Sequence, residues 1–425
     1  MGKRFSFIHC ADLHLGEPFA GLRSGDVGPW TEAIGKATFQ AFEAVVDTAI
    51  ESHVDAILIA GDVYNDSHHS LAAQMAFARE LYRAAQSGIR IFIVHGNHDP
   101  DDAWRADIPL PDAVHVFSAD HTEAVPIYVD GERVATVYGR SFATRHVEEN
   151  LAASFVREPE DGFAIGLLHT EAGNPNSPYA PCSLDDLRMA KMDYWALGHQ
   201  HTRTVLSETP FIVYPGNTQG LNQNETGPRG CYLVDVGTFG TVSLTFQETD
   251  KVRWMDLPFD ISAYRDAETL LADIRKVRAG LKNETNRPNI VRLIFTGSGP
   301  LHRVISNEAG REYLFQALNE REQFRHIFTY FASMEDKTRS ELDLVGRREI
   351  PDGCGDFLRA YDTVANLPKE VLLKELSAIC ASQPEVIKMP QLMGLIDENM
   401  MLSAFKKAEL LGAERLSEEG DNENH

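Results

Sequence analysis

Five short polar clusters, each directly after an apolar segment, constrain the fold of this chain more than any other feature. They read HCADLH, AGDVYN, HGNHD, LLHTEAG and LGHQH, and they lie between residues 9 and 201. A short apolar run that ends in polar residues is typical of a buried strand that delivers a loop. In open α/β sheets, ligand sites gather beyond the carboxyl ends of the strands. We therefore expect the five clusters to converge on one patch.

The segments around these clusters alternate between strand-like and helix-like patterns, which predicts a layered α/β domain. Apolar residues recur at helical spacing in 32–52, and a second helix is expected at 70–87. The expected strands lie at 4–10, within 55–62 and 89–99, and at 134–138, 163–169, 192–198, 211–214 and 231–236.

The pattern changes after about residue 250. A helix over 261–281, a strand over 289–297, a helix near 307–321 and a strand at 327–333 predict a small α+β cap domain. Residues 346–356 combine Gly, Pro and charges, which favours a linker. Helices near 357–382 and 391–413 follow, and the polar tail SEEGDNENH is expected to be disordered. The predicted domains are thus 1–250, a cap at 251–345, a linker at 346–356 and C-terminal helices in 357–425.

Charge and composition narrow the class of protein. The formal net charge is −23, and residues 1–250 carry 16 Lys and Arg against 34 Asp and Glu, whereas 251–350 carry 17 against 15. The middle segment is therefore where contacts to a nucleic-acid backbone are least opposed by charge. Five scattered cysteines form no CxxC pair, which disfavours a zinc–thiolate site and fits a reducing cytoplasm. Because the sequence holds no run of eighteen apolar residues and no secretory signal at its start, we expect a cytoplasmic protein without a membrane span.

The polar residues of the clusters are the types that bind divalent metal ions. Each piece alone has a structural reading: a Gly-Asp after a strand is usually a turn, and Gly-Asn-His-Asp also suits a tight turn. Their combination at five strand ends favours a metal site. Two ions about 3.5–4 Å apart can clamp both oxygens of an in-line displacement at phosphorus. The clusters therefore predict a two-metal site suited to phosphoester chemistry.

The order and form of these motifs resemble the calcineurin-like metallophosphoesterases. Within them the chain resembles the SbcD-type DNA repair exonuclease subunits, and most closely the YhaO-like bacterial branch. The resemblance is carried by HCADLHLG, AGDVYN, HGNHD, LLHTEAG, YWALGHQHTR and VYPGNTQG with the following GPRGCYLVD. It implies a layered β-sandwich metallophosphoesterase domain flanked by helices in residues 1–250, followed by the α+β cap and the C-terminal helices.

The resemblance also implies two bound manganese ions and a division of roles among the cluster residues. One ion would be held by Asp12, His14, Asp62 and His201. The other would be held by Asp62, Asn97, His169 and His199, so that Asp62 bridges the two. His98 would stabilise charge at the scissile phosphate or protonate the leaving oxygen, and Asp99 would orient His98.

One position departs from part of the family. Some relatives carry a second catalytic histidine three residues after the bridging aspartate, where this chain has Asn65. An amide does not transfer protons at neutral pH. The substitution therefore bears on the strength of the exonuclease activity and not on the metal site. His68 and His69 lie nearby in the sequence and are alternatives for this role, with a surface location as the simpler reading.

Further substrate contacts are expected near the site. The segment Tyr214–Gln219 lies near the active site in relatives, which makes Asn217 a candidate contact to DNA, with a turn before a strand as the alternative. Arg203 and Arg229 are candidate phosphate partners on the same face.

The resemblance implies a manganese-dependent nuclease that degrades double-stranded DNA ends 3′ to 5′ and cuts single strands, in DNA double-strand break repair, using a hydroxide activated by the two metals. The chain holds no P-loop motif, so ATP hydrolysis would fall to an SbcC-like or YhaN-like coiled-coil ATPase. The C-terminal helices would dock to that partner or pack on this chain's own core, and a homodimer is expected. The alternatives are an enzyme for a small phosphodiester or phosphomonoester, and a non-catalytic scaffold that binds DNA ends.

Overall fold

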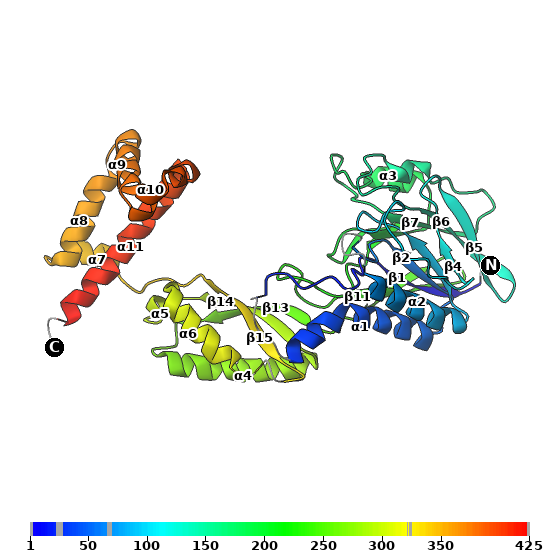
Figure 1. The fold of residues 1–425 in the computed structure, drawn as a ribbon, viewed down its shortest axis with the longest axis horizontal. Helices are drawn as coiled ribbons and strands as arrows, with labels where there is room; N and C mark the ends of the chain where they lie inside the picture. The colour runs from blue at the N-terminus through cyan, green and yellow to red at the C-terminus, as the bar shows by residue number, and fades with distance from the viewer. Residues whose placement is uncertain (1–2, 23–28, 66–69, 321, 323–324, 423–425) are drawn as a thin grey trace. The chain divides into compact units, whose positions relative to one another are not determined.

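The computed structural model describes residues 3–22, 29–65, 70–320, 322 and 325–422 (Figure 1). Contacts between residues divide the chain into two units. The first unit comprises Met1–Phe259, Leu271–Ile294 and Glu312–Glu335. The second comprises Asp260–Leu270, Phe295–Arg311 and Asp336–His425.

Two six-stranded sheets form the centre of the first unit. The first sheet has the order β12-β11-β1-β2-β3-β4 and the second the order β5-β6-β7-β8-β10-β9. The strands of the first sheet are β1 (Phe5–Cys10), β2 (Ala56–Ala60), β3 (Arg90–Val94), β4 (Val114–Val116), β11 (Gly230–Val236) and β12 (Val242–Glu248). Those of the second are β5 (Glu123–Val129), β6 (Glu132–Arg140), β7 (Phe163–His169), β8 (Tyr194–Gly198), β9 (Thr204–Glu208) and β10 (Phe211–Tyr214). Strands β1 to β4 pair in parallel, as do β6, β7, β8 and β10.

Alternation of side chains along the strands builds a four-layer structure, because successive residues of a strand point to opposite faces. On β1, Phe7 belongs to a buried cluster shared with the second sheet, whereas Ile8 packs with the helices α1 (Pro29–Glu51) and α2 (Leu71–Gln86). The outer face of the second sheet buries Trp195 with Leu187 of the short helix α3 (Leu184–Met189). The result is a β-sandwich flanked by helices, which confirms the predicted fold class.

The strands that the sequence patterns did not predict lie mostly at or near sheet edges. Strands β4, β5, β9 and β12 end their sheets. Edge strands are exposed on one side and tolerate residues that interior strands exclude, and β5 even contains Pro126. Their apolar pattern is correspondingly weak.

A three-stranded sheet follows, with the order β13-β14-β15. Its strands are β13 (Arg253–Asp260), β14 (Asn289–Thr296) and β15 (Thr329–Asp336). The helices between these strands in the sequence are α4 (Ala267–Thr285), α5 (His302–Ser306) and α6 (Glu308–Asn319). The helix expected over 261–281 begins only at Ala267, because Ile261 and Tyr264 form a turn through a backbone hydrogen bond. Within the first unit, Trp30 of α1 stacks on Tyr330 of β15 with ring centroids 4.9 Å apart.

The C-terminal part is helical. Its elements are α7 (Leu344–Arg348), α8 (Gly353–Ala365), α9 (Lys369–Ala381), α10 (Pro384–Lys388), the 3-10 helix η4 (Pro390–Leu395) and α11 (Glu398–Asn422). Residues 346–356, expected as a linker, contain the end of α7 and the first turn of α8, where the side chain of Asp352 accepts a hydrogen bond from Gly355. The tail expected to be disordered is helical up to Asn422, and 423–425 lie outside the described residues. Within the ranges that the structure describes, no helix is both long and apolar enough to cross a membrane.

The packing between the two sheets yields a matched test of stability. Phe7 is fully buried, whereas Phe239 is 78% exposed. We expect Phe7→Ala to lower the free energy of unfolding by about 3–5 kcal/mol, because a large cavity forms between the sheets. We expect Phe239→Ala to change it by less than about 0.5 kcal/mol. Urea titration followed by circular dichroism measures both, and equal losses would contradict the assigned core.

Candidate metal centre

The clusters predicted from the sequence lie at neighbouring strand ends. Asp12, Asp62 and Asn97 follow the parallel strands β1, β2 and β3 of the first sheet. His169 ends β7, and His199 follows β8, in the second sheet. Because the two sheets pack face to face, these ends bring residues from distant parts of the sequence into contact.

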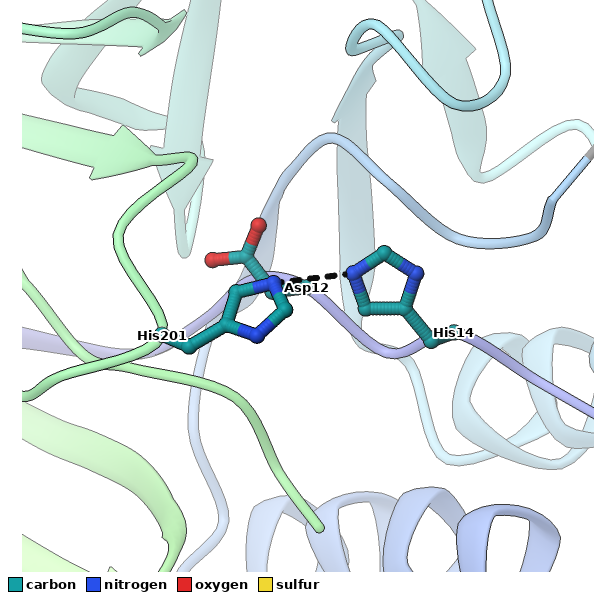
Figure 2. A group of neighbouring side chains, drawn as sticks. All are labelled: Asp12, His14 and His201. Atoms are coloured by element: carbon teal, nitrogen blue, oxygen red, sulfur yellow. Dashed lines mark hydrogen bonds between the residues drawn. The ribbon is translucent and has the colours of Figure 1, made fainter. Parts of the chain in front are cut away.

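One group of potential metal ligands consists of Asp12, His14 and His201, shown in Figure 2. Their ligand atoms all lie within 4.8 Å of one another. The Nε2 atoms of His14 and His201 are 3.0 Å apart and both face the interior of the group. This is a compact set of one carboxylate and two imidazoles.

A second group lies beside the first and consists of Asp12, Asp62 and His169. The Nε2 atom of His169 is 3.4 Å from Oδ2 of Asp62 and 3.0 Å from Oδ1 of Asn97. The same Asn97 oxygen lies 3.1 Å from Nδ1 of His199. The structure therefore brings all seven expected metal ligands together.

The two aspartates connect the groups. Asp12 is a member of both. Oδ2 of Asp62 lies 3.4 Å from His169 and 3.9 Å from His14, so it stands between imidazoles of the two groups. Two ions, one in each group, would therefore be neighbours, and both carboxylates would lie beside them.

The backbone at the site is strained. Four of the seven residues, none of them glycine, have positive φ: Asp12 (52°), His14 (43°), Asp62 (53°) and His199 (108°). Residues other than glycine adopt positive φ rarely and at a cost, and such residues cluster at functional sites. The surrounding fold therefore stabilises a conformation that the loops would not adopt alone.

Glycines allow the sheets to approach closely at the site. A Cβ atom at Gly96 would collide with the carboxylate of Asp62 and with the ring of His169, and one at Gly198 would collide with the carbonyl group of Ala60. These contacts explain why a glycine precedes the ligands in HGNHD and LGHQH.

Burial gives the site its electrostatic character. Burial raises the pKa of Asp12 to about 6, against the opposing effect of nearby imidazoles, and it also raises the pKa of Asp62. Burial lowers the pKa of His14 and His169, and it lowers that of His199 to about 3 with help from neighbouring imidazoles. These imidazoles are therefore neutral, which is the form that binds metals.

The donor set fits divalent cations. Asp12 and Asp62 are almost completely buried, and within the described ranges neither forms an ion pair with a lysine or arginine. A buried carboxylate without a cation is costly, and neutral imidazole and carboxylate groups are the ligands that manganese, iron and zinc accept. The site therefore suits two positive ions.

The sequence did not reveal the residue that orients His201. Nδ1 of His201 donates a hydrogen bond to Oε1 of Glu225 at 2.8 Å. Burial alone would lower the pKa of His201, but Glu225 and Asp12 raise it to about 9. A bound cation would replace the proton on Nε2, and Nδ1 would keep the proton that it donates to Glu225. His169 is oriented in a similar way, because its Nδ1 donates to the carbonyl oxygen of Ala60 at 2.8 Å. Glu225 lies in none of the five clusters, and no sequence signal marked it.

Asn217 and Arg229, the candidate contacts to DNA, belong to the hydrogen-bond network that holds Glu225. Asn217 is fully buried and donates to Oε2 of Glu225 at 2.8 Å. Arg229 is only 8% exposed and donates to the backbone carbonyl of His201 and to Oδ1 of Asn217. Both side chains are buried and form hydrogen bonds within the protein. We therefore propose that they have a structural role in place of the expected contact with DNA.

Among the described residues, no hydrogen bond joins Asp99 to His98. Its carboxylate accepts hydrogen bonds from the backbone amides of Asp62, Val63 and Gly96 at 2.8–3.1 Å, so it fixes the loops after β2 and β3 to each other. His98 is half-buried, its amide donates to Asp62, and its ring centroid is 5.1 Å from that of His14. Within the described part of the chain, Nδ1 of His98 has no hydrogen-bond partner.

The remaining predicted residues lie at the edge of the site. Arg203 is exposed, two residues after His201, and its guanidinium lies 3.6 Å from the centroid of the Phe246 ring. Asn65 is half-buried and donates to Glu17 at 3.2 Å. The alternatives His68 and His69 lie outside the described residues.

Comparison with known proteins agrees with this geometry. The family model of the calcineurin-like phosphoesterases matches residues 5–203, and the model for the middle domain of the metallophosphoesterase YhaO matches residues 254–339. The chain is 36% identical over 342 residues to a Bacillus subtilis protein named uncharacterized metallophosphoesterase YhaO, which covers 80% of this chain and 83% of the relative. The chain belongs to the calcineurin-like metallophosphoesterase family, whose members are phosphoester hydrolases with a dinuclear metal site.

More distant relatives extend over similar lengths. The chain is 26% identical over 360 residues to the DNA double-strand break repair protein Mre11 of Sulfurisphaera tokodaii, covering 80% of this chain and 85% of the relative. It is 24% identical over 403 residues to the DNA double-strand break repair protein Mre11 of Methanopyrus kandleri, and the alignment covers 88% of this chain and 83% of the relative.

The contact between Glu225 and His201 predicts a specific loss of metal affinity. We expect Glu225→Gln to weaken one manganese site about 10- to 100-fold, because the imidazole loses the carboxylate that orients and polarises it. Isothermal titration with Mn²⁺ measures the change, and Glu208→Gln, an exposed substitution on β9, is the control. Equal affinities in the two variants would show that Glu225 does not support the ligand.

Proposed function

We propose that this chain is a manganese-dependent DNA nuclease that degrades double-stranded ends from 3′ to 5′, cuts single strands and acts in double-strand break repair. The observation that carries the proposal is the convergence of the seven expected metal ligands, two of them buried aspartates without a lysine or arginine partner among the described residues. Relatives named DNA double-strand break repair protein Mre11, which align over 80% and 88% of the chain, favour DNA as the substrate.

In this proposal the site residues divide between two metals as the family resemblance implies. Asp12, His14 and His201 would hold one ion, Asn97, His169 and His199 would hold the other, and Asp62 would contact both. When bound, the two ions supply a nucleophile at neutral pH and neutralise charge on the phosphodiester. Glu225 and the carbonyl of Ala60 hold the Nδ1 protons of His201 and His169, which directs the Nε2 lone pairs toward the ions.

His98 would act on the substrate. Its backbone is fixed by the hydrogen bond to Asp62, and its ring lies beside that of His14 at the edge of the site. In this proposal the half-buried ring of His98 would donate a proton to the leaving oxygen. Arg203, exposed and stacked on Phe246, would contact a phosphate next to the scissile one. Asn65 would contribute an amide hydrogen bond to the substrate in place of a second catalytic histidine.

The segments after the site would serve the DNA and a partner. We propose that 1–250 form the nuclease domain and that 251–345 cap it and contact DNA, because that segment carries 15 basic against 14 acidic residues, whereas 1–250 are strongly acidic. The C-terminal helices would dock to an SbcC-like or YhaN-like ATPase, and the protein would form a homodimer. Apolar side chains on these helices support docking rather than burial in the chain's own core, since Ile379, Ile387, Leu395 and Met400 are each more than half exposed.

A substrate comparison tests the proposal. The purified chain is incubated with Mn²⁺ and either end-labelled duplex DNA or the chromogenic diester bis(p-nitrophenyl) phosphate. We expect metal-dependent shortening of the duplex, with products that retain a 5′ label until late. Turnover of the small diester without DNA cleavage would favour a small-substrate enzyme, and binding of DNA ends without turnover of either substrate would favour a scaffold.

Substitution of His98 separates catalysis from metal binding. We expect His98→Ala to reduce DNA hydrolysis by about 10²–10⁴-fold, because the leaving oxygen loses its proton donor. The metal content of this variant should remain at about two ions per chain, the number that the two-metal chemistry requires. Plasma mass spectrometry of the dialysed protein measures the content, and loss of metal would show that His98 is a ligand.

A further inference from the structure

His199 is the most strained of the expected ligands. Its φ of 108° lies outside the small left-handed region that histidine tolerates, so neighbouring groups must hold it in place. Its amide donates to both oxygens of Asp12 at 3.1 and 3.2 Å, which fixes the backbone. These contacts leave the orientation of the imidazole undetermined.

Glu171 approaches the ring from the side away from the site. Nδ1 of His199 points to Asn97, and Nε2 lies 3.7 Å from Oε2 of Glu171. Glu171 is held at both ends, because its amide donates to the carbonyl of Tyr179 at 2.9 Å and its other carboxylate oxygen accepts from Asn174. A carboxylate at this distance is too far for a hydrogen bond but attracts and polarises the N–H group at Nε2.

Tyr179 contacts the same ring, with the two ring planes inclined at 41°. Its ring centroid is 4.9 Å from that of His199. The backbone of Tyr179 is tied to Val147 by a parallel β-bridge, and hydrogen bonds from Val147 to Pro178 and from Ala180 to Val147 flank it. A short closed loop after β7 thus presents a carboxylate and an aromatic ring to one imidazole.

We infer that Glu171 and Tyr179 are positioning residues for His199, which keep Nδ1 directed at the metal shared with Asn97 and His169 and so set the affinity of that ion. The arrangement parallels the contact of Glu225 with His201, but it acts on the other group of ligands and through the opposite ring nitrogen. A carboxylate behind a metal-binding imidazole fixes the ring and increases its basicity. This inference rests on the metal site of the proposed function.

Calorimetric titration of the full chain with Mn²⁺ tests the inference without measuring activity. We expect Glu171→Gln and Tyr179→Ala each to weaken one of the two manganese sites about 10- to 100-fold and to leave the other unchanged. Tyr179→Phe should behave as the unsubstituted chain, because the ring rather than the hydroxyl contacts His199. Glu208→Gln is again the control, and circular dichroism verifies that each variant is folded.

The outcomes separate this inference from the proposed function. Two manganese sites of unchanged affinity in Glu171→Gln and Tyr179→Ala would overturn the positioning role, and a raised KM for DNA in the same variants would then identify both residues as substrate contacts. Failure of the unsubstituted chain to bind two ions would overturn the proposed metal site itself. A combined variant, Glu171→Gln with Glu225→Gln, should weaken both sites.

Discussion

The metal centre of the first unit is shaped by the free-energy cost of burying the carboxylates of two aspartates. Asp12 and Asp62 lie where the parallel strands of the sandwich end, and the groups within reach of their oxygens in the described chain are imidazoles and backbone amides. Burying a charge without a counter-charge is among the largest costs a fold can carry. Divalent ions remove that cost and simultaneously require neutral imidazoles, which burial already favours at His14, His169 and His199.

Bringing the ligands together also explains the backbone conformation of the loops. To place carboxylates and imidazoles from five strand ends within ligand distance, the chain accepts positive φ at non-glycine residues and packs glycine against neighbouring ligands and backbone. The cost of this strain is offset by the extensive cores on both faces of each sheet, which fix the strands that carry the loops. Asp99 contributes without touching an ion, because its carboxylate joins three amides of the loops after β2 and β3.

Sequence patterns predicted the features of the fold that depend on residues close together in the sequence. Apolar runs that end in polar clusters predicted the interior strands and the clusters that contain the seven expected ligands, since strand burial and strand-end loops are encoded within a few residues. The family resemblance, not the pattern, implied the role of each ligand. The patterns missed Glu225, and they did not show that Asn217 and Arg229, the candidate contacts to DNA, join it in a network with His201. That network forms only when separate segments of the chain pack together. The patterns also began α4 too early, at Ile261, because apolar side chains in the turn before the helix mimic helical spacing.

The large negative charge of the chain is compatible with a DNA substrate once the site's own ions are considered. The acidic excess lies mainly in residues 1–250, which also contain the ligands. Two bound divalent ions would reverse the field at the site, whereas the acidic residues elsewhere in this segment would repel a polyanion. Arg203, exposed and stacked on Phe246, follows His201 by two residues and would add a positive charge near the site. Affinity for DNA would then depend on metal occupancy, so the carboxylates that support the metal-binding imidazoles act on substrate binding as well as on catalysis.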